Sequence, residues 1–250
     1  MGIGPLLSWN YTSQSVLLNR FKLPLSISFL SGLGYIIFSS LFQLYVFVAI
    51  MGVSFTLSSI LGEFYKSFKK QKNSSNFLHS VVKMFLSNRH KNGGYIVHIG
   101  IVLLFIGFIG RAFEVEKEFS LSPGEQIYFS NYVFKLNSIK SEARDNHYAF
   151  LSEIDVVDSS TNQLLTNLKP EKRIYFYWNS DPEKRQPHSE LDIYSTIQKD
   201  IYSIFSGYDA QKNIGYFKIM INPLVNWVWI GGVLMVIGSL FAFWPSRRNS

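Results

Sequence analysis

The stretch Asn92-Gly93-Gly94-Tyr95-Ile96-Val97-His98-Ile99-Gly100 opens an apolar run that continues to Gly110. The run contains no Asp, Glu, Lys or Arg, and His98 is its only histidine. An uncharged apolar run of about 18 residues or more is typical of a membrane-spanning helix. A histidine inside such a helix is rare and points to function, and imidazole is a good axial ligand for haem iron. From this spacing alone, a hydrogen bond from His98 to a neighbouring helix is an equally good interpretation.

Three further apolar segments have the length of membrane spans: 23–42, 44–62 and 223–244. Gln43 is the only strongly polar break between the first two, so we expect a tight turn there and a helical hairpin. One helix of about 38 residues is the alternative, but it would overshoot a bilayer of roughly 30 Å. Pro24 stands near the expected start of the first span, where proline is tolerated. The predicted fold class is an α-helical polytopic membrane protein with about four transmembrane helices.

The amino-acid composition excludes several classes of function. The sequence is 47% hydrophobic and has no cysteine, which excludes disulfides and cysteine-based metal or redox chemistry. The formal net charge is +7, but the basic residues cluster beside apolar runs, as topology signals do. We therefore expect membrane lipid around the chain and no nucleic acid. Residues 1–22 lack a small-residue cleavage site after a short apolar core, so no signal peptide is expected.

The segment 63–92 is a basic connector in which Glu63 is the only acid. The positive-inside rule places it in the cytoplasm. Apolar residues within 77–86 are spaced for a short helix lying on the membrane surface. His79 and His90 sit in this basic neighbourhood outside any apolar run, so we interpret both as solvated side chains.

Residues 112–221 form a polar block between the last two spans, on the outer face of the membrane in this topology. Short segments with a period of two, such as 113–121, 132–136 and 150–157, are separated by turn residues. This pattern predicts a small β-rich barrel or sandwich. His147 and His188 are isolated histidines in polar surroundings, and we expect both at the surface. No Ser-His-Asp arrangement and no Gly-rich loop is present, so the chain has no complete catalytic site of these kinds.

Several segments resemble the CcmF family of cytochrome c maturation proteins. The stretch 92–100, with basic residues before it, is similar to a family motif that opens an apolar helix. Met1–Trp9 is similar to a mid-chain Gly-x-Gly-Pro-Leu-Leu-x-Trp segment, and 222–232 to the opening of the last helix. Inside the polar block, 170–175 and 199–203 resemble two shorter family elements. The resemblance covers essentially the whole chain but only the C-terminal part of the family.

The resemblance implies a role in a haem lyase complex, which attaches haem to the Cys-x-x-Cys-His motif of apocytochrome c. It also implies a b-type haem held between membrane spans by two histidines, and His98 matches one of these axial ligands. The family's Trp-rich haem-docking segment, its outer-face histidines and the second b-haem ligand are not found in this sequence. We therefore expect the C-terminal part of a split CcmF that shares haem b with an N-terminal CcmF-like chain.

Further partners implied by the resemblance are the haem chaperone CcmE, apocytochrome c and its thiol-handling factor CcmH. The expected location is the inner membrane, with the β-rich domain facing the periplasm. The alternative is a non-catalytic membrane scaffold with His98 as a structural hydrogen-bond donor. The expected order along the chain is a lead-in at 1–22, the hairpin at 23–62, the connector at 63–92, the His98 helix at 93–111, the outer domain at 112–221, the last helix at 222–245 and a cytoplasmic tail at 246–250.

Overall fold

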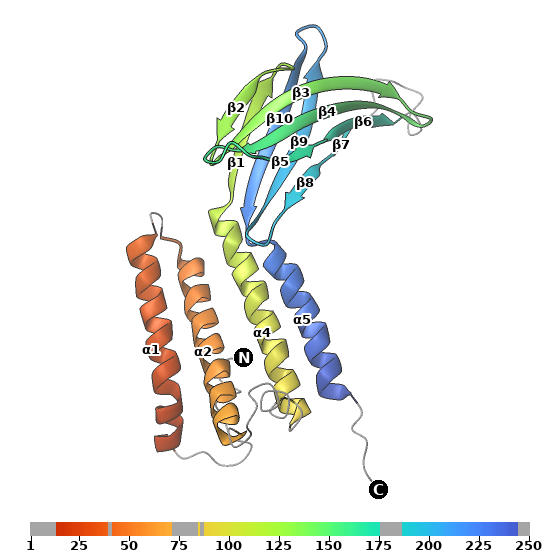
Figure 1. Ribbon diagram of the computed structural model, residues 1–250. Coiled ribbons are helices and arrows are strands. Elements are labelled where there is room, and N and C mark those ends of the chain that lie inside the picture. The colour runs from red at the N-terminus through yellow and green to blue at the C-terminus, as the bar shows by residue number, and fades with distance from the viewer. Residues whose placement is uncertain (1–13, 40–41, 72–84, 86–87, 176–186, 245–250) are drawn as a thin grey trace. The chain divides into compact units, whose positions relative to one another are not determined.

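A computed structural model describes residues 14–39, 42–71, 85, 88–175 and 187–244 (Figure 1). The chain divides into a helical unit, formed by residues 1–112 and 224–250, and a β unit, formed by residues 113–223. The β unit is thus inserted in the chain between two helices of the helical unit. The segment 1–9, His79, the tail 246–250 and, apart from Phe85, the expected surface helix at 77–86 lie outside the described residues.

Four helices of the helical unit are long and apolar enough to cross a membrane. The predicted class, a membrane protein with about four spans and a β-rich domain, is confirmed. The four helices are α1 (Gln14–Phe38), α2 (Leu44–Gln71), α4 (Arg89–Gly110) and α5 (Asn226–Phe243). A short 3-10 helix, η2 (Arg111–Phe113), follows α4.

Helices α1 and α2 are separate, and polar contacts join them at two levels. The Gln43 backbone N–H donates to the Tyr35 hydroxyl oxygen at 3.1 Å, which ties the connection to the end of α1. Deeper in the pair, the buried Ser28 hydroxyl donates to the Met51 carbonyl oxygen at 2.8 Å. Because α1 begins at Gln14, Pro24 lies inside the helix and not in its first turn.

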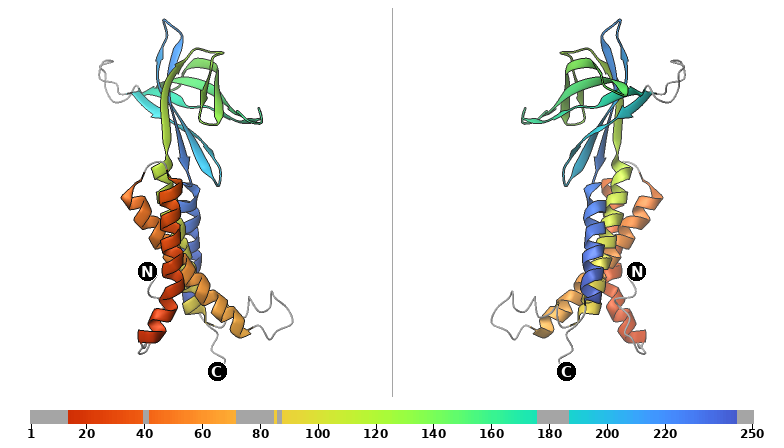
Figure 2. Two further views of the ribbon diagram at one scale, coloured as in Figure 1. Left: turned by 90° about the vertical axis from the view of Figure 1, so that its left-hand side faces the viewer. Right: turned by 90° about the vertical axis from the view of Figure 1, so that its right-hand side faces the viewer.

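Helices α4 and α5 run antiparallel and touch along a line of glycines (Figures 1 and 2). Gly93, Gly100 and Gly107 recur every seven residues, so they lie on one side of α4. A Cβ atom on Gly100 would lie 2.6 Å from the Gly231 carbonyl oxygen, and one on Gly231 would lie 2.5 Å from the Gly100 oxygen. At the next level, Gly238 meets Gly93 in the same way. The two backbones therefore approach more closely than any side chain allows.

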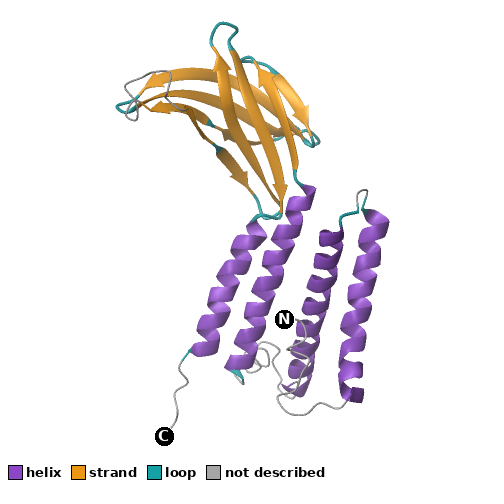
Figure 3. Ribbon diagram, turned by 180° about the vertical axis from the view of Figure 1, so that it is seen from behind, coloured by secondary structure: helices purple, strands orange, loops and turns teal. Residues whose placement is uncertain are grey.

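The β unit consists of two antiparallel sheets that pack face to face (Figure 3). One sheet has the strand order β1-β10-β9-β8, and the other has the order β2-β3-β4-β6-β7, with β5 paired to β4. The strands are β1 (Val115–Leu121), β2 (Gln126–Phe129), β3 (Tyr132–Ala143), β4 (His147–Asp158), β5 (Leu164–Leu168), β6 (Glu171–Tyr175), β7 (Pro187–Glu190), β8 (Asp192–Ser195), β9 (Lys199–Asp209) and β10 (Ile214–Pro223).

The core of the β unit is built from alternate residues of both sheets. Phe205 and Phe217 stack in the four-stranded sheet, with ring centroids 4.8 Å apart and an interplanar angle of 12°. The ring centroid of Phe119 lies 6.0 Å from that of Phe217 and 6.5 Å from that of Phe134, which belongs to the other sheet. These rings join the two sheets into one hydrophobic core.

The glycine contact predicts a difference between two neighbouring substitutions in α5. Gly231→Ala places a methyl group against the α4 backbone, whereas a Cβ on Gly232 meets nothing within 4 Å. Both changes alter helix propensity equally, so we expect Gly231→Ala to be less stable than Gly232→Ala by about 1–3 kcal/mol. Thermal unfolding of the two variants in the same detergent, followed by circular dichroism, measures this difference. Equal midpoints would contradict the close contact.

Candidate functional site

The His98 side chain forms a hydrogen bond within its own helix. Its Nδ1 atom lies 2.8 Å from the Gly94 carbonyl oxygen, one turn earlier in α4. A carbonyl oxygen can only accept, so Nδ1 carries the hydrogen and donates it. In the neutral imidazole, this tautomer leaves the lone pair on the other ring nitrogen, Nε2. Among the residues that the structure describes, Nε2 has no hydrogen-bond partner.

The surroundings of His98 leave space beside the ring. A Cβ atom on Gly94 would meet nothing within 4 Å, so the surface of α4 is open one turn from His98. Successive helix residues are about 100° apart, which turns His98 roughly 160° away from the Gly100 side that α5 covers. Phe105, two turns further along, is exposed. In the described helices, this side of α4 is thus only partly covered, and the His98 side chain is half-buried.

A polar and aromatic cluster joins α2 to α4 one turn before Gly94. Glu63 Oε2 lies 3.4 Å from Lys91 Nζ, and the Glu63 side chain is only 12% exposed. Lys91 Nζ also lies 5.4 Å from the centre of the Tyr95 ring, which is 5% exposed. Phe64 packs its edge against Tyr95 at 5.3 Å. Because Lys91 and Tyr95 share a side of α4 with His98, this cluster fixes the rotation of the helix that carries His98.

The start of α4 lies earlier than the apolar run. Asn88 is the N-cap residue, and its side-chain oxygen accepts a hydrogen bond from the Lys91 backbone N–H at 3.1 Å. The buried Asn92 side chain donates to the Phe85 carbonyl oxygen at 3.2 Å. The helix therefore begins at Arg89, and His98 lies in its third turn.

The other described histidines form no contact with His98. His90 is exposed and its ring lies 6.3 Å from that of Phe243, and His188 is exposed in β7. The expectation of a surface position is wrong for His147, which is 7% exposed. His147 lies opposite Tyr175 in the β4–β6 pair, with ring centroids 4.9 Å apart, and this partner covers it.

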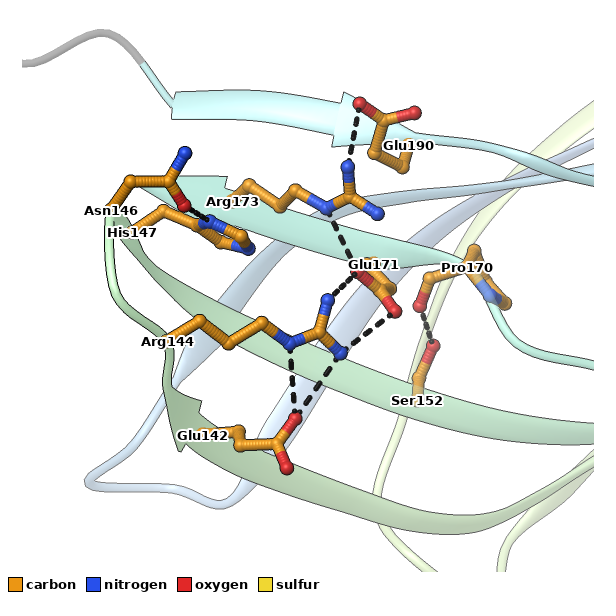
Figure 4. A network of polar contacts seen from close by, with 9 residues as sticks. All are labelled: Glu142, Arg144, Asn146, His147, Ser152, Pro170, Glu171, Arg173 and Glu190. Atoms are coloured by element: carbon orange, nitrogen blue, oxygen red, sulfur yellow. Dashed lines mark hydrogen bonds and ion pairs between the residues drawn. The ribbon is translucent and has the colours of Figure 1, made fainter. Parts of the chain in front are cut away.

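A charged network covers the end of the β unit where β3, β4, β6 and β7 meet (Figure 4). Glu171 accepts from Arg173 Nε at 2.9 Å and lies 3.4 Å from the Arg144 guanidinium. Arg144 also pairs with Glu142, and Arg173 with Glu190. Hydrogen bonds to Tyr175 and to Glu171 raise the pKa of Arg173, so it stays charged. Every charge of the network has a partner of opposite sign, and the network links strands instead of presenting a binding site.

The structure brings no complete metal site together in the residues that it describes. No group of three or more His, Asp or Glu side chains is placed to hold an ion there. His98 Nε2 is a single donor atom, and a six-coordinate haem iron takes two axial ligands. The described residues therefore place one imidazole nitrogen at this position.

Four apolar helices with a β-sandwich inserted before the last of them define a membrane protein with one β-rich domain. A family model described as the CcmF C-terminal beta-sandwich matches residues 112–223. CcmF of Haemophilus influenzae is 23% identical over 248 residues, which is 99% of this chain and 36% of that protein. The cytochrome c-type biogenesis protein ccl1 of Rhodobacter capsulatus is 28% identical over 61% of this chain and 22% of that protein.

A solved structure titled cytochrome c heme lyase CcmF shares the fold, with a TM-score of 0.72 and 19% identity. The match covers 98% of this chain and 37% of that one. By these comparisons the chain is similar to the C-terminal part of CcmF. It spans little more than a third of the length of these two CcmF proteins.

Two features of the site were not predicted from the sequence. The glycines that hold α4 to α5 carry a visible signal, a spacing of seven residues within an apolar helix. The pairing of Glu63 with Lys91 has a weaker signal in the sequence. Glu63 stands out as the single acid of a basic segment, but its partner is far away in the chain. Only the packing of α2 on α4 identifies that partner.

The Glu63–Lys91 pair predicts a charge-reversal rescue. Glu63→Gln removes the ion pairs with Lys91 and Lys66 and should lower stability by about 0.5–1 kcal/mol. Glu63→Lys places three cations together and should be less stable still, and adding Lys91→Glu should restore part of the loss. Thermal unfolding in detergent measures each variant. Lys69→Gln is the matched control, because Lys69 is exposed on α2 and forms no ion pair among the described residues. Additive effects of the two reversals would contradict the pairing.

Proposed function

We propose that the chain is a subunit of a haem lyase complex in c-type cytochrome biogenesis, and that His98 Nε2 is an axial ligand of a membrane-embedded b-type haem. The relatives are named as cytochrome c-type biogenesis proteins and as a haem lyase, which supports the general role. The observation that carries the ligand assignment is the Nδ1 hydrogen bond to Gly94, because it favours the neutral tautomer in which Nε2 has the lone pair that binds a metal.

The residues of this chain prepare the ligand. The Gly94 carbonyl oxygen holds the His98 ring in one tautomer and one orientation. The absence of a side chain on Gly94 keeps the neighbouring helix surface clear for a planar ligand. A haem bound at this position would supply an electron that keeps the incoming haem iron reduced for attachment.

The alternative, a non-catalytic scaffold, needs His98 as a link between helices. The hydrogen bond of His98 goes to its own helix, and among the described residues no second helix receives one from it. The contact between α4 and α5 is made by glycines instead, and that between α2 and α4 by Glu63 and Lys91. These contacts hold the helices without His98, so the ligand role is the better explanation of this histidine.

A second chain is part of the proposal. His98 supplies one imidazole, and the curated relatives are much longer than this chain. We infer an N-terminal CcmF-like chain as the source of the second ligand of a shared haem b. CcmE, apocytochrome c and CcmH are proposed as further partners, and lipid covers the exposed apolar faces of the helices.

The proposed location is the inner membrane, with the β unit in the periplasm. The motivation is the excess of Lys and Arg between α2 and α4, on the opposite side of the membrane from the β unit in this topology. The β unit is long enough for its own charges to have little influence on orientation.

His98→Ala should remove most of the haem from the complex purified with its partner chain. With two imidazole ligands, the wild-type complex should show a low-spin b-type absorption spectrum, and the variant should lose this spectrum together with cytochrome c maturation. His90→Ala, an exposed histidine of the same helix, is the control and should leave both unchanged. Full haem occupancy with an unaltered spectrum in His98→Ala would favour the scaffold.

Reporter fusions test the orientation. Asn162 is exposed in the turn between β4 and β5, where an insertion disturbs no strand. A tag at Asn162 should be accessible from the periplasm of intact cells, and a tag after Ser250 should not. Labelling with a membrane-impermeant reagent measures both. The reverse pattern would contradict the proposed location of the β unit.

A further inference from the structure

Strand β1 lies at the edge of the four-stranded sheet. Among the strands that the structure describes, it pairs with β10 alone. In an antiparallel pair, alternate residues direct their backbone N–H and C=O groups away from the partner strand. Residues 115–118 of β1 are all exposed. β1 therefore presents a row of unpaired backbone donors and acceptors over seven residues.

The charge beside this edge is negative and regularly spaced. Glu116 and Glu118 lie on the same face of β1 because side chains alternate along a strand, with a spacing of about 7 Å, and Glu114 directly precedes the strand. Lys218 on β10 pairs with Glu116 at 2.8 Å. In the described part of the chain, Glu114 and Glu118 have no ion pair. The hydrogen bond to Glu116 raises the pKa of Lys218, and Glu118 and Glu114 add to the effect.

A hollow of about 280 Å³ lies on the same face, next to the edge. It forms where a bulge shifts the β9–β10 register, so that Gly207 pairs with Tyr216 and Phe205 with Phe217. Ser206 is left without a partner in the ladder, and the local surface is indented. The lining residues are Glu118, Phe119, Ser120, Ser206, Tyr216 and Phe217. The hollow is large enough to receive a side chain from a strand added to β1.

We propose that the β1 edge binds an extended, basic polypeptide segment by strand addition, with cationic residues at alternate positions facing the glutamates. Backbone hydrogen bonds supply the attachment, and charge supplies the selection. A second copy of this chain is a poor occupant, because pairing two β1 edges sets like charges opposite each other. A basic strand instead supplies cations to Glu114 and Glu118, which form no ion pair in the described fold. The proposal does not depend on the role of His98.

Fluorescence anisotropy with the full chain in neutral detergent micelles tests the charge selection. The probe is a labelled nine-residue peptide of alternating Lys and Thr, and a Glu/Thr peptide is its counterpart. We expect saturable binding of the Lys peptide that weakens with salt, and no binding of the Glu peptide. Glu114→Gln and Glu118→Gln should each weaken binding by about two- to fivefold. Asp145→Asn, which removes an exposed carboxylate from the β3–β4 turn, should have no effect.

Backbone methylation distinguishes strand addition from surface attraction. Two versions of the Lys peptide carry N-methyl groups on alternate residues, one on the odd set and one on the even set. In strand addition only one set faces β1, so one version should lose binding and the other should retain it. His98→Ala should bind the parent peptide like the wild type, which separates this result from the haem proposal. Equal binding of both methylated versions, or unchanged affinity in the two Glu→Gln variants, would overturn the proposal.

Discussion

The helical unit depends on the backbone contact between α4 and α5. Lipid tails are as apolar as leucine, so the hydrophobic effect does not hold helices together inside a membrane. Close approach has to supply the attraction through dispersion, and it requires glycines that face each other, as Gly100 and Gly231 do. The chain enters the β unit from α4 and returns in α5. This one contact therefore fixes the alignment of α4 with α5, the two helices from which the chain enters and leaves the β unit. It also fixes the side of α4 on which His98 lies.

The hydrogen bond between His98 and Gly94 shows how a polar group is accommodated in such a helix. A buried imidazole needs a partner for its N–H, and here the partner is a carbonyl oxygen of the preceding turn. The bond satisfies the donor without engaging another helix. The other nitrogen, Nε2, can accept a hydrogen bond from a donor outside the described residues, or it can bind a metal ion. The hydrogen bond within the helix and the coordination chemistry of imidazole thus support the same proposal.

The sequence predicted the four spans, the β-rich block and the position of His98 in an apolar helix, because each has a strong local signal. Helix ends were less predictable. α1 and α4 begin among polar and basic residues, at Gln14 and Arg89, where the apolar pattern carries no information. The burial of His147 was also missed, because Tyr175 lies opposite it only through strand pairing. Contacts between residues distant in the chain are what a local pattern cannot show.

The two acidic regions of the β unit differ in a way that stability alone does not explain. In the network around Glu171, every charge is paired, and the pairs link β3 and the β3–β4 turn to β6 and β7. Along one face of the β1 edge, Glu116, Glu118 and the preceding Glu114 lie near the cation Lys218, and their mutual repulsion opposes folding. A charge that costs stability and excludes a second copy of the same edge has its natural use in selecting a partner of opposite sign. In this proposal the acidic edge selects the partner by its charge, whereas the paired network around Glu171 stabilises the β unit.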